Sequence, residues 1–311
     1  MKHLFIIDPV ERLNLPIDTS LHLADALIRS GETIYLCHPS DLTLTKKSIF
    51  ADVFQLRKFS TERERLEFGL RESVPLADFA SIYLRKDPPF DLSYITATWL
   101  LDFAGPDCKV YNSPQSLRTY NEKLSIFHFP QYVDHALFTA DVKALVNFLG
   151  HEAGGDAILK PIDLYGGRDI VRIQQNKMND GQILELLNQQ TQNGTLARLM
   201  QPFNTKIFDG EVRAFYAKGT PIAWCLKKPK ENQFLANTGA GATLHPFTPS
   251  KKLETDITDV AKQLWAKGAA LVGFDIIGER ISEINITSPR LLAADPNKKP
   301  YFDKMAKVML G

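Results

Sequence analysis

The stretch that decides the fold is residues 274–286, which read Phe-Asp-Ile-Ile-Gly-Glu-Arg-Ile-Ser-Glu-Ile-Asn-Ile. Two apolar runs flank a short polar turn, a pattern typical of a β-hairpin. Glu283 and Asn285 lie two residues apart and therefore point to the same face of a strand. If the turn closes at residues 278–280, Asp275 lies opposite Glu283 and the three side chains converge. Such oxygen ligands suit Mg2+ and phosphates; the alternative is a hairpin with a solvated polar face.

Length and composition indicate an ordinary globular protein of two or three domains. The chain has 311 residues, of which 44% are hydrophobic and 23% charged, and its net charge is +1. Because no excess of positive charge is available to replace counterions, binding to nucleic acid or to an anionic membrane is not expected. No apolar run is long enough for a membrane helix, and the N-terminal run is too short for a signal peptide.

The cysteine count favours a reducing compartment. Three cysteines are scattered without the spacing of a metal finger or a disulfide framework, so we expect a cytoplasmic protein. Cys225 lies in a strand-like run and is interpreted as a core thiol. No constellation of serine, cysteine or histidine for nucleophilic catalysis is recognisable.

The first third of the chain alternates strands and helices. Residues 3–7, 33–37 and 81–84 are expected to be strands, and residues 20–29 form an amphipathic helix that ends at Gly31. Strands separated by helical segments predict an α/β fold with a doubly wound parallel sheet. We place this N-terminal domain at residues 1–120.

Two further units follow a break near residues 111–114. A helix is expected over 115–125, and residues 121–200 form a small mixed unit of strands and one helix. The last unit, 201–311, begins as a meander. Its polar stretch 231–245 lacks helical or strand periodicity, and a loop of that length is usually functional or disordered.

A lysine and two glycines suggest a phosphate site in the middle unit. Lys160 ends an apolar strand, and Gly166 and Gly167 follow closely. A lysine can hold phosphate as a point charge, and glycine lets backbone N–H groups approach it. The alternative is an ordinary turn. The loop matches neither GxxxxGK[ST] nor GxGxxG, so a nucleotide site would use another architecture.

Two arginines are also candidates. Arg213 lies in a strand-like run, where an exposed edge position is the alternative. Arg85 and Lys86 end an apolar strand, and Pro88 and Pro89 stiffen its exit. These two cations form a positive corner suited to a substrate carboxylate, unless they are simply a solvated strand end.

Together these residues resemble one family, the bacterial glutathione synthetases, which are ATP-grasp ligases. The stretches that carry the resemblance, in order, are residues 85–91, 121–124, 158–161, 166–167, 272–278 and 283–289. The resemblance runs from the first strand to about Pro289. Arg-Lys-Asp-Pro-Pro-Phe-Asp at 85–91 and Glu-Ile-Asn-Ile-Thr-Ser-Pro at 283–289 are specific to this family rather than general to ATP-grasp proteins.

The resemblance implies a fold and a reaction. The N-terminal α/β domain would precede two ATP-grasp subdomains, 121–200 and 201–311, that hold ATP between two sheets. ATP would phosphorylate the C-terminal carboxylate of γ-glutamylcysteine to an acyl phosphate, and glycine would then displace the phosphate. The implied cofactors are ATP and Mg2+, which Mn2+ can replace. The implied partners are these small molecules and further copies of the chain in a homo-oligomer.

The resemblance also assigns roles to residues. The residues that would contact the nucleotide are Lys123, Lys160, Gly166, Gly167, Gln201 and Glu211, with Gln201 at the adenine and Glu211 near the ribose. The implied Mg2+ ligands are Asp275, Glu283 and Asn285. Arg213 would stabilise the acyl phosphate electrostatically. The residues toward the peptide and the acceptor would be Arg85, Lys228, Asn237 and Gly241.

The chain departs from the family in three places. In the glycine-rich loop, Leu164 stands where glycine is usual, followed by Tyr165. The stretch 231–245 corresponds to a mobile lid, yet residues 233–242 contain no arginine. Lys228 stands where an arginine is usual, and Arg290 where a small polar residue is common. These departures leave two alternatives open: a related ATP-grasp ligase with another substrate pair, or a weakened nucleotide-binding homologue.

Overall fold

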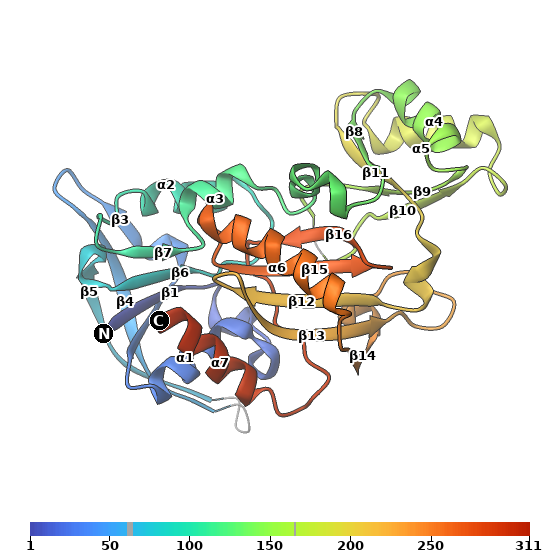
Figure 1. Cartoon of the computed structure of the whole chain (residues 1–311). Coiled ribbons are helices and arrows are strands. Elements are labelled where there is room, and N and C mark those ends of the chain that lie inside the picture. The colour runs from blue at the N-terminus through green and yellow to red at the C-terminus, as the bar shows by residue number, and fades with distance from the viewer. Residues whose placement is uncertain (61–64, 165) are drawn as a thin grey trace.

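The computed structural model describes residues 1–60, 65–164 and 166–311, which fold into three β-sheets with helices packed against them (Figure 1). The N-terminal sheet contains seven strands in the order β3-β4-β2-β1-β6-β7, with β5 paired to β4. Their bounds are β1 Lys2–Ile6, β2 Thr33–Cys37, β3 Leu42–Leu44, β4 Ile49–Ser60, β5 Arg65–Pro75, β6 Ser81–Leu84 and β7 Lys109–Tyr111.

The N-terminal sheet is mixed rather than wholly parallel. Strands β2, β1, β6 and β7 pair in parallel, as the alternation of strands and helices predicts. Strands β3, β4 and β5 add an antiparallel part that the sequence analysis did not anticipate. The long hairpin of β4 and β5 carries many charged residues, and β5 is largely exposed, so the apolar alternation of a buried strand is weak there.

Helices cover the N-terminal sheet. Helix α1 (Thr19–Arg29) begins at Asp18, whose carboxylate accepts a hydrogen bond from the Leu21 N–H at 2.8 Å. The other helices near this sheet are α2 (Leu92–Leu101), α3 (Pro114–Thr119) and the C-terminal α7 (Lys299–Leu310). The expectation of a helix over 115–125 is wrong beyond Thr119, because Tyr120 leaves the helical conformation and a separate 3-10 turn follows at Leu124–His128.

The second sheet is small and antiparallel, in the order β10-β9-β11-β8. Its strands are β8 Leu137–Thr139, β9 Asp156–Lys160, β10 Val171–Gln174 and β11 Arg198–Pro202. Helices α4 (Val142–His151) and α5 (Asp180–Gln190) bury leucine and isoleucine side chains against the strands. The unit projects over the third sheet at the upper right of Figure 1.

The third sheet is antiparallel, in the order β14-β13-β12-β15-β16. Its strands are β12 Glu211–Ala217, β13 Thr220–Lys228, β14 Thr243–Pro246, β15 Leu271–Ile277 and β16 Arg280–Asn285. Strand β14 begins inside the stretch 231–245 that was expected to be a loop, and it pairs with the end of β13. Helix α6 (Lys251–Ala266) packs on one face of the sheet, where Phe274 and Ile276 are buried.

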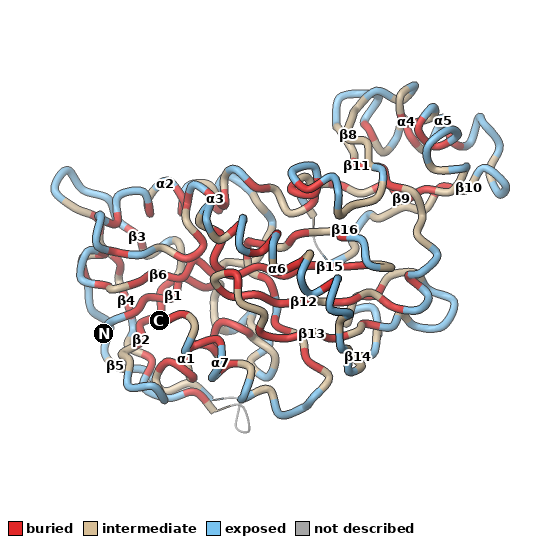
Figure 2. The backbone as a smooth tube through the Cα atoms, viewed as in Figure 1, coloured by how far each residue is buried: buried red, intermediate tan, exposed pale blue. Residues whose placement is uncertain are grey.

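The opposite face of the third sheet has two parts. Near α7 it is apolar and buries Phe215, Ala217 and Leu271. Further along the same strands, the period of two brings Arg213 and Asp275 to this face. Figure 2 shows buried backbone running through the centre of this sheet into the N-terminal sheet. The polar end of the face is therefore held by a continuous core.

One buried side chain joins the N-terminal domain to the third sheet. The Asn112 amide donates hydrogen bonds to the carbonyls of Leu271 (2.8 Å) and Ile286 (2.6 Å), and its oxygen accepts one from the Leu271 N–H at 2.7 Å. Asn112 is 3% exposed. Among the described residues, no helix is both long and apolar enough to cross a bilayer.

We predict that Asn112→Ala lowers the free energy of unfolding by about 2–4 kcal/mol, because buried backbone groups of β15 lose their partners. Chemical denaturation followed by circular dichroism measures the change. The matched control is Asn176→Ala, which removes an exposed amide and should shift stability by less than about 0.5 kcal/mol. Equal losses in both variants would contradict the bridging role.

Candidate active site

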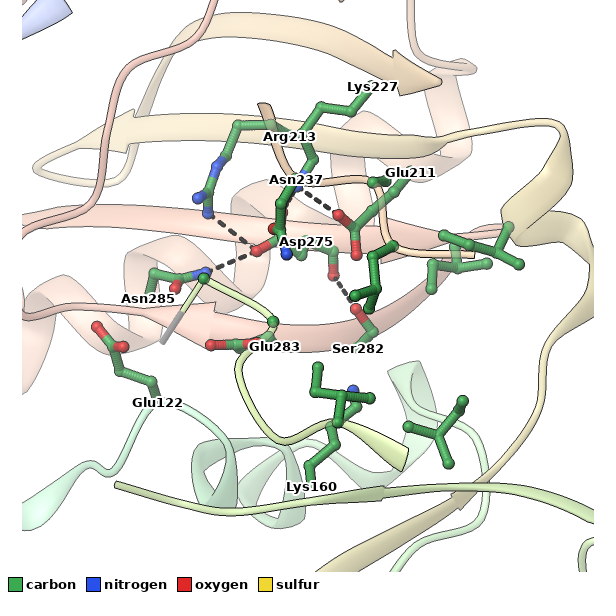
Figure 3. A pocket seen from close by; sticks show the side chains of 18 of the residues that line it. Glu122, Lys160, Glu211, Arg213, Lys227, Asn237, Asp275, Ser282, Glu283 and Asn285 are labelled. Carbon is green, nitrogen blue, oxygen red and sulfur yellow. Dashed lines mark hydrogen bonds and ion pairs between the residues drawn. The ribbon is translucent and has the colours of Figure 1, made fainter. Parts of the chain in front are cut away.

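A cavity of about 530 Å³ lies between the second and third sheets. Strands β9 and β11 form one wall, and β12, β13, β15 and β16 form the other (Figure 3). The glycine-rich loop and the stretch Phe234–Gly239 also line it. Its volume lies in the range of small-molecule sites. One part of the lining is apolar and includes Ile158, Ile170, Ile277 and Ile281; another carries most of the charged groups.

Asp275 and Glu283 lie opposite each other as expected, but the turn differs from the expected closure at 278–280. Ile277 pairs with Arg280, and a register shift between Asp275 and Ile276 brings Glu283 opposite Asp275. Asp275 pairs directly with Glu283, and Asn285 pairs with Gly273. The Asn285 amide donates to the Asp275 carboxylate at 2.9 Å. All three side chains line the cavity (Figure 3), so the convergence inferred from residues 274–286 is confirmed as geometry.

Asp275 is the centre of a buried ion network. Arg213 approaches one carboxylate oxygen at 3.1 Å, and Lys227 approaches the other at 2.6 Å. Lys227 also pairs with Glu211. Burial alone would raise the pKa of Asp275, but Arg213 and Lys227 outweigh it and hold that pKa below its usual value. Burial would lower the pKa of Lys227, yet Asp275 and Glu211 raise it, so Lys227 stays charged.

Arg213 has room in this network because its neighbour is glycine. A Cβ atom on Gly273 would lie 2.9 Å from the Arg213 Nη1 and 3.0 Å from the Pro289 Cβ. Both distances are too short for an ordinary contact. Any larger residue at 273 would therefore displace the guanidinium from Asp275.

The lysine that faces the cavity from β13 is Lys227, not Lys228. Lys227 pairs across the strands with Glu211 and is 3% exposed. Lys228 is exposed and does not line the cavity. Because side chains alternate along a strand, an alignment shifted by one residue selects the opposite face. The expectation that Lys228 lies toward the substrate therefore transfers to its neighbour.

Lys160 and Lys123 lie on the side of the second sheet. Lys160 lines the cavity and forms no hydrogen bond or ion pair with any described residue, and burial lowers its pKa. Lys123 is buried; its ammonium donates to the Leu164 carbonyl at 2.5 Å and lies 3.8 Å from Glu283. Lys160 is thus available to an anionic ligand, while Lys123 is bound to the glycine-rich loop.

The glycine-rich loop touches the lid stretch. Gly167 has a φ of +77°, and a Cβ on it would lie 2.3 Å from the Asn237 amide nitrogen. Both facts require glycine at this position. Gly166 also has a positive φ but has open space around its Cα. Gly241 ends a 3-10 turn in the left-handed conformation and does not line the cavity.

Leu164, which stands where the family usually has glycine, does not take part in the contact between Gly167 and Asn237. Leu164 lines a small separate hollow together with Phe90, Tyr120 and Ile162. Its backbone carbonyl, not its side chain, meets Lys123. Tyr165, the other unusual residue of the loop, lies outside the described residues.

The apolar part of the cavity is supported by a stacked arginine. Gln201 is buried in β11 and lines the cavity beside Phe203. The Arg172 guanidinium lies 3.3 Å from the centre of the Phe203 ring, and its bidentate pair with Asp156 orients it. Phe203 also contacts the stretch 231–245, because the centres of the Phe203 and Phe234 rings lie 5.9 Å apart. These aromatic contacts were not foreseen from the sequence.

Arg85 does not line the cavity; its guanidinium links the N-terminal domain to the segment after β16. Its guanidinium donates to the Ser20 hydroxyl at 3.1 Å and to the Pro289 carbonyl at 2.9 Å. It is 4% exposed, and its Nη1 has no hydrogen-bond partner among the described residues. The positive corner expected at 85–86 therefore fixes the segment after β16.

Glu122 is a site residue that the sequence analysis quoted without giving it a role. One carboxylate oxygen accepts hydrogen bonds from the N–H groups of Ile286 (3.1 Å) and Thr287 (3.0 Å) and from the Thr287 hydroxyl (2.6 Å). Burial, with Glu283 nearby, raises the pKa of Glu122. Its position beside Lys123 in a stretch that carries the family resemblance was the available signal.

The donor set fits a divalent metal ion such as Mg2+. Glu283 forms no hydrogen bond with a described residue, and the Asn285 oxygen is free because the amide nitrogen makes both of its contacts. Asp275 supplies a second carboxylate, already surrounded by cations. Oxygen ligands of this kind, with several waters, are what Mg2+ takes in nucleotide sites.

We predict that Lys160→Met stabilises the ligand-free protein by on the order of 1 kcal/mol, because a half-buried charge that makes no hydrogen bond or ion pair with a described residue is replaced by an apolar side chain. The same change should abolish most of the rise in melting temperature that a nucleotide produces. Differential scanning calorimetry with and without ATP measures both effects. The control is Lys177→Met, an exposed lysine; a Lys160→Met protein that ATP stabilises like the wild type would contradict the role.

We predict that Lys227→Met lowers the free energy of unfolding by about 3 kcal/mol, because Glu211 and Asp275 keep their burial and lose their shared cation. Lys228→Met should change it by less than about 0.5 kcal/mol. Chemical denaturation of the two variants decides between the neighbouring lysines. A larger loss for Lys228→Met would contradict the strand register described above.

Solved structures share the fold. D-cycloserine synthetase DcsG superposes with a TM-score of 0.67 at 12% identity, covering 98% of this chain and 99% of that one. The macrocyclase MdnC from Microcystis aeruginosa, bound to its precursor peptide MdnA, gives a TM-score of 0.65 at 11% identity over the full length of both chains. At these identities the likeness concerns the ATP-grasp fold alone.

Sequence relatives are closer. Glutathione synthetase of Ralstonia nicotianae is 34% identical over 291 residues, covering 93% of this chain and 88% of that protein. Glutathione synthetase of Nitrosomonas europaea is 34% identical over 296 residues, covering 93% and 90%. Residues 1–118 match the family model for the N-terminal domain of prokaryotic glutathione synthetase, and residues 122–294 match the model for its ATP-grasp domain. The chain therefore belongs to the prokaryotic glutathione synthetase family.

Proposed function

We propose that the protein is an ATP-dependent ligase that joins γ-glutamylcysteine to glycine and releases ADP and phosphate. The observation that carries the proposal is the convergence of Arg213, Asp275, Glu283 and Asn285 in one cavity. The cavity also contains Lys160, whose ammonium is bonded to none of the described residues. Such a site combines oxygen ligands for a metal with cations for transferring phosphate, which is what carboxylate activation needs.

The nucleotide would lie along the cavity from the apolar part to the charged part. Ile158, Gln201 and Phe203 offer a flat, partly apolar slot for a purine base. Glu211 lies between this slot and Asp275, at a position suited to the ribose hydroxyls. Lys160 would bind the phosphates as a point charge, with Gly166 and Gly167 allowing close approach of the loop.

The chemistry would occur beside Arg213. The C-terminal carboxylate of γ-glutamylcysteine attacks the γ-phosphorus, ADP leaves, and the acyl phosphate forms; the glycine amine then attacks the carbonyl carbon and phosphate leaves. Arg213 is held toward this point by Asp275 and stabilises the charge that develops on the phosphoryl oxygens. Mg2+, or Mn2+ in its place, would supply charge neutralisation at the phosphates. We also propose that the enzyme acts in the cytoplasm as a homo-oligomer.

We predict that purified protein with ATP, Mg2+, γ-glutamylcysteine and glycine releases phosphate only when both substrates are present. Glu283→Gln should lower the rate at least about 100-fold, because it removes a charged oxygen ligand while keeping the size of the side chain. A coupled phosphate assay measures both, and added chelator should abolish the wild-type rate.

Control reactions separate this proposal from its alternatives. Turnover with other dipeptides or amines, and none with γ-glutamylcysteine and glycine, would show a ligase with a different substrate pair. ATP binding without turnover on any acceptor would show a nucleotide-binding homologue. A Glu283→Gln rate near that of the wild type would remove Glu283 from the metal site.

A further inference from the structure

Two oppositely charged side chains at the cavity make no hydrogen bond or ion pair with a described residue, although the buried Arg85 attracts one of them, Asp87, electrostatically. Asp87 and Arg290 both line the cavity. Within the described part of the chain, neither side chain forms a hydrogen bond or an ion pair, and they do not pair with each other. By contrast, the charged groups around Asp275 are bonded to one another, and Glu122 is bonded to backbone.

Both residues project from segments that are bonded together. The Arg85 guanidinium donates to the Pro289 carbonyl at 2.9 Å, and the Ser288 hydroxyl donates to the Arg85 carbonyl at 3.3 Å. Asp87 follows Arg85 by two residues, and Arg290 follows Pro289. The two charges therefore lie at the same end of the cavity, where Pro88, Ser288 and Pro289 also line it.

The backbone at both positions is fixed from outside the cavity. The Asp87 N–H donates to the Asp8 carboxylate at 2.7 Å. The N–H of Leu291, the residue after Arg290, donates to the Thr19 hydroxyl at 2.9 Å. The backbone that carries both side chains is therefore already fixed. Binding then costs less conformational entropy than it would on a mobile loop.

An unpaired carboxylate and an unpaired guanidinium at one end of a cavity are complementary to a zwitterion. Resting on the proposed function, we propose that Asp87 and Arg290 bind the α-ammonium and α-carboxylate groups of the γ-glutamyl residue. The γ-linkage leaves both groups free, and neither takes part in the reaction. Glycine does not fit this pair, because its amine must be unprotonated and free to attack. Arg290 can hold the carboxylate with two parallel hydrogen bonds.

The experiment combines two variants with two substrate analogues. Arg290→Gln and Asp87→Asn remove one charge each and keep the size of the side chain. The analogue 4-aminobutanoylcysteine lacks the α-carboxylate, and glutarylcysteine lacks the α-amine. KM for each donor, for glycine and for ATP is measured by phosphate release. Donor binding is measured independently by calorimetry with a non-hydrolysable ATP analogue and Mg2+.

Each variant should lose affinity only for donors that carry its matching group. Arg290→Gln should raise KM and Kd for γ-glutamylcysteine about 10- to 100-fold, the usual effect of losing a charged hydrogen bond. It should change KM for 4-aminobutanoylcysteine less than about twofold. Asp87→Asn should behave in the same way, with glutarylcysteine as the insensitive donor. KM for glycine and ATP should stay unchanged in both variants.

Other outcomes would overturn the assignment. A rise in KM for glycine alone would assign Arg290 to the acceptor. Equal losses for the parent donor and its analogue, or no loss at all, would show that the two side chains do not contact the head group. Arg57→Gln makes the same chemical change at an exposed position of β4, and it should have no effect.

The calorimetry separates this proposal from the proposed function. If the wild type binds γ-glutamylcysteine but does not turn it over, the proposed function fails and the Kd values of the variants still decide the head-group site. If the wild type does not bind γ-glutamylcysteine, the head-group site is wrong as well.

Discussion

The site depends on how the Asp275 carboxylate is compensated inside the third sheet. Four neighbouring strands contribute to it: Lys227 from β13, Arg213 from β12, Asp275 from β15 and Asn285 from β16. A buried carboxylate is costly unless cations and hydrogen bonds surround it, so the four strands are tolerated together only in this register. The strand pairing that serves the fold therefore also sets the positions of the candidate metal ligands.

The charged side chains on the two sides of the cavity differ in whether they are bonded to one another. On the third sheet, cations and carboxylates neutralise one another before any ligand arrives. On the second sheet, Lys160 is half-buried and its side chain makes no hydrogen bond or ion pair with a described residue. Glu283, Glu211 and Asp275 attract this charge without bonding to it, so an anion that contacts Lys160 directly should gain more than at a paired lysine. Under the proposed function, this asymmetry would favour the polyphosphate at the second sheet and leave the third sheet for the metal ligands and the reacting groups.

How far the sequence predicts this structure depends on the pattern in each segment. The pairing of Asp275 with Glu283 was predicted from a turn at 278–280, but in the structure Ile277 pairs with Arg280 and a register shift between Asp275 and Ile276, which no sequence pattern signals, produces that pairing. The parallel strands β1, β2 and β6 were predictable from their apolar runs. Strands β4 and β5 were not, because charged residues and an exposed edge obscure their alternation. The resemblance placed Lys228 toward the substrate, whereas the strand register turns Lys227 into the cavity, and two adjacent lysines give no sequence signal of which one faces inward. The links made by Asn112, Glu122 and Arg85 join residues far apart in the chain, and no local pattern encodes them.

The lid explains why so much of the charge sits on rigid elements. The stretch 231–245 contains neither lysine nor arginine, and it contacts the rest of the site through the Phe234 ring and the Asn237 amide. A mobile loop that carries cations must order long side chains when it closes, which costs conformational entropy. Here the cations near the reacting groups, Arg213 and Lys227, are on strands and are already oriented by Asp275. If the stretch acts as the lid that the resemblance implies, it would exclude water and contact the glycine-rich loop near Gly167. A lid of this kind is compatible with electrostatic stabilisation of a bound phosphate because that stabilisation comes from preorganised groups and does not require the loop to supply charge.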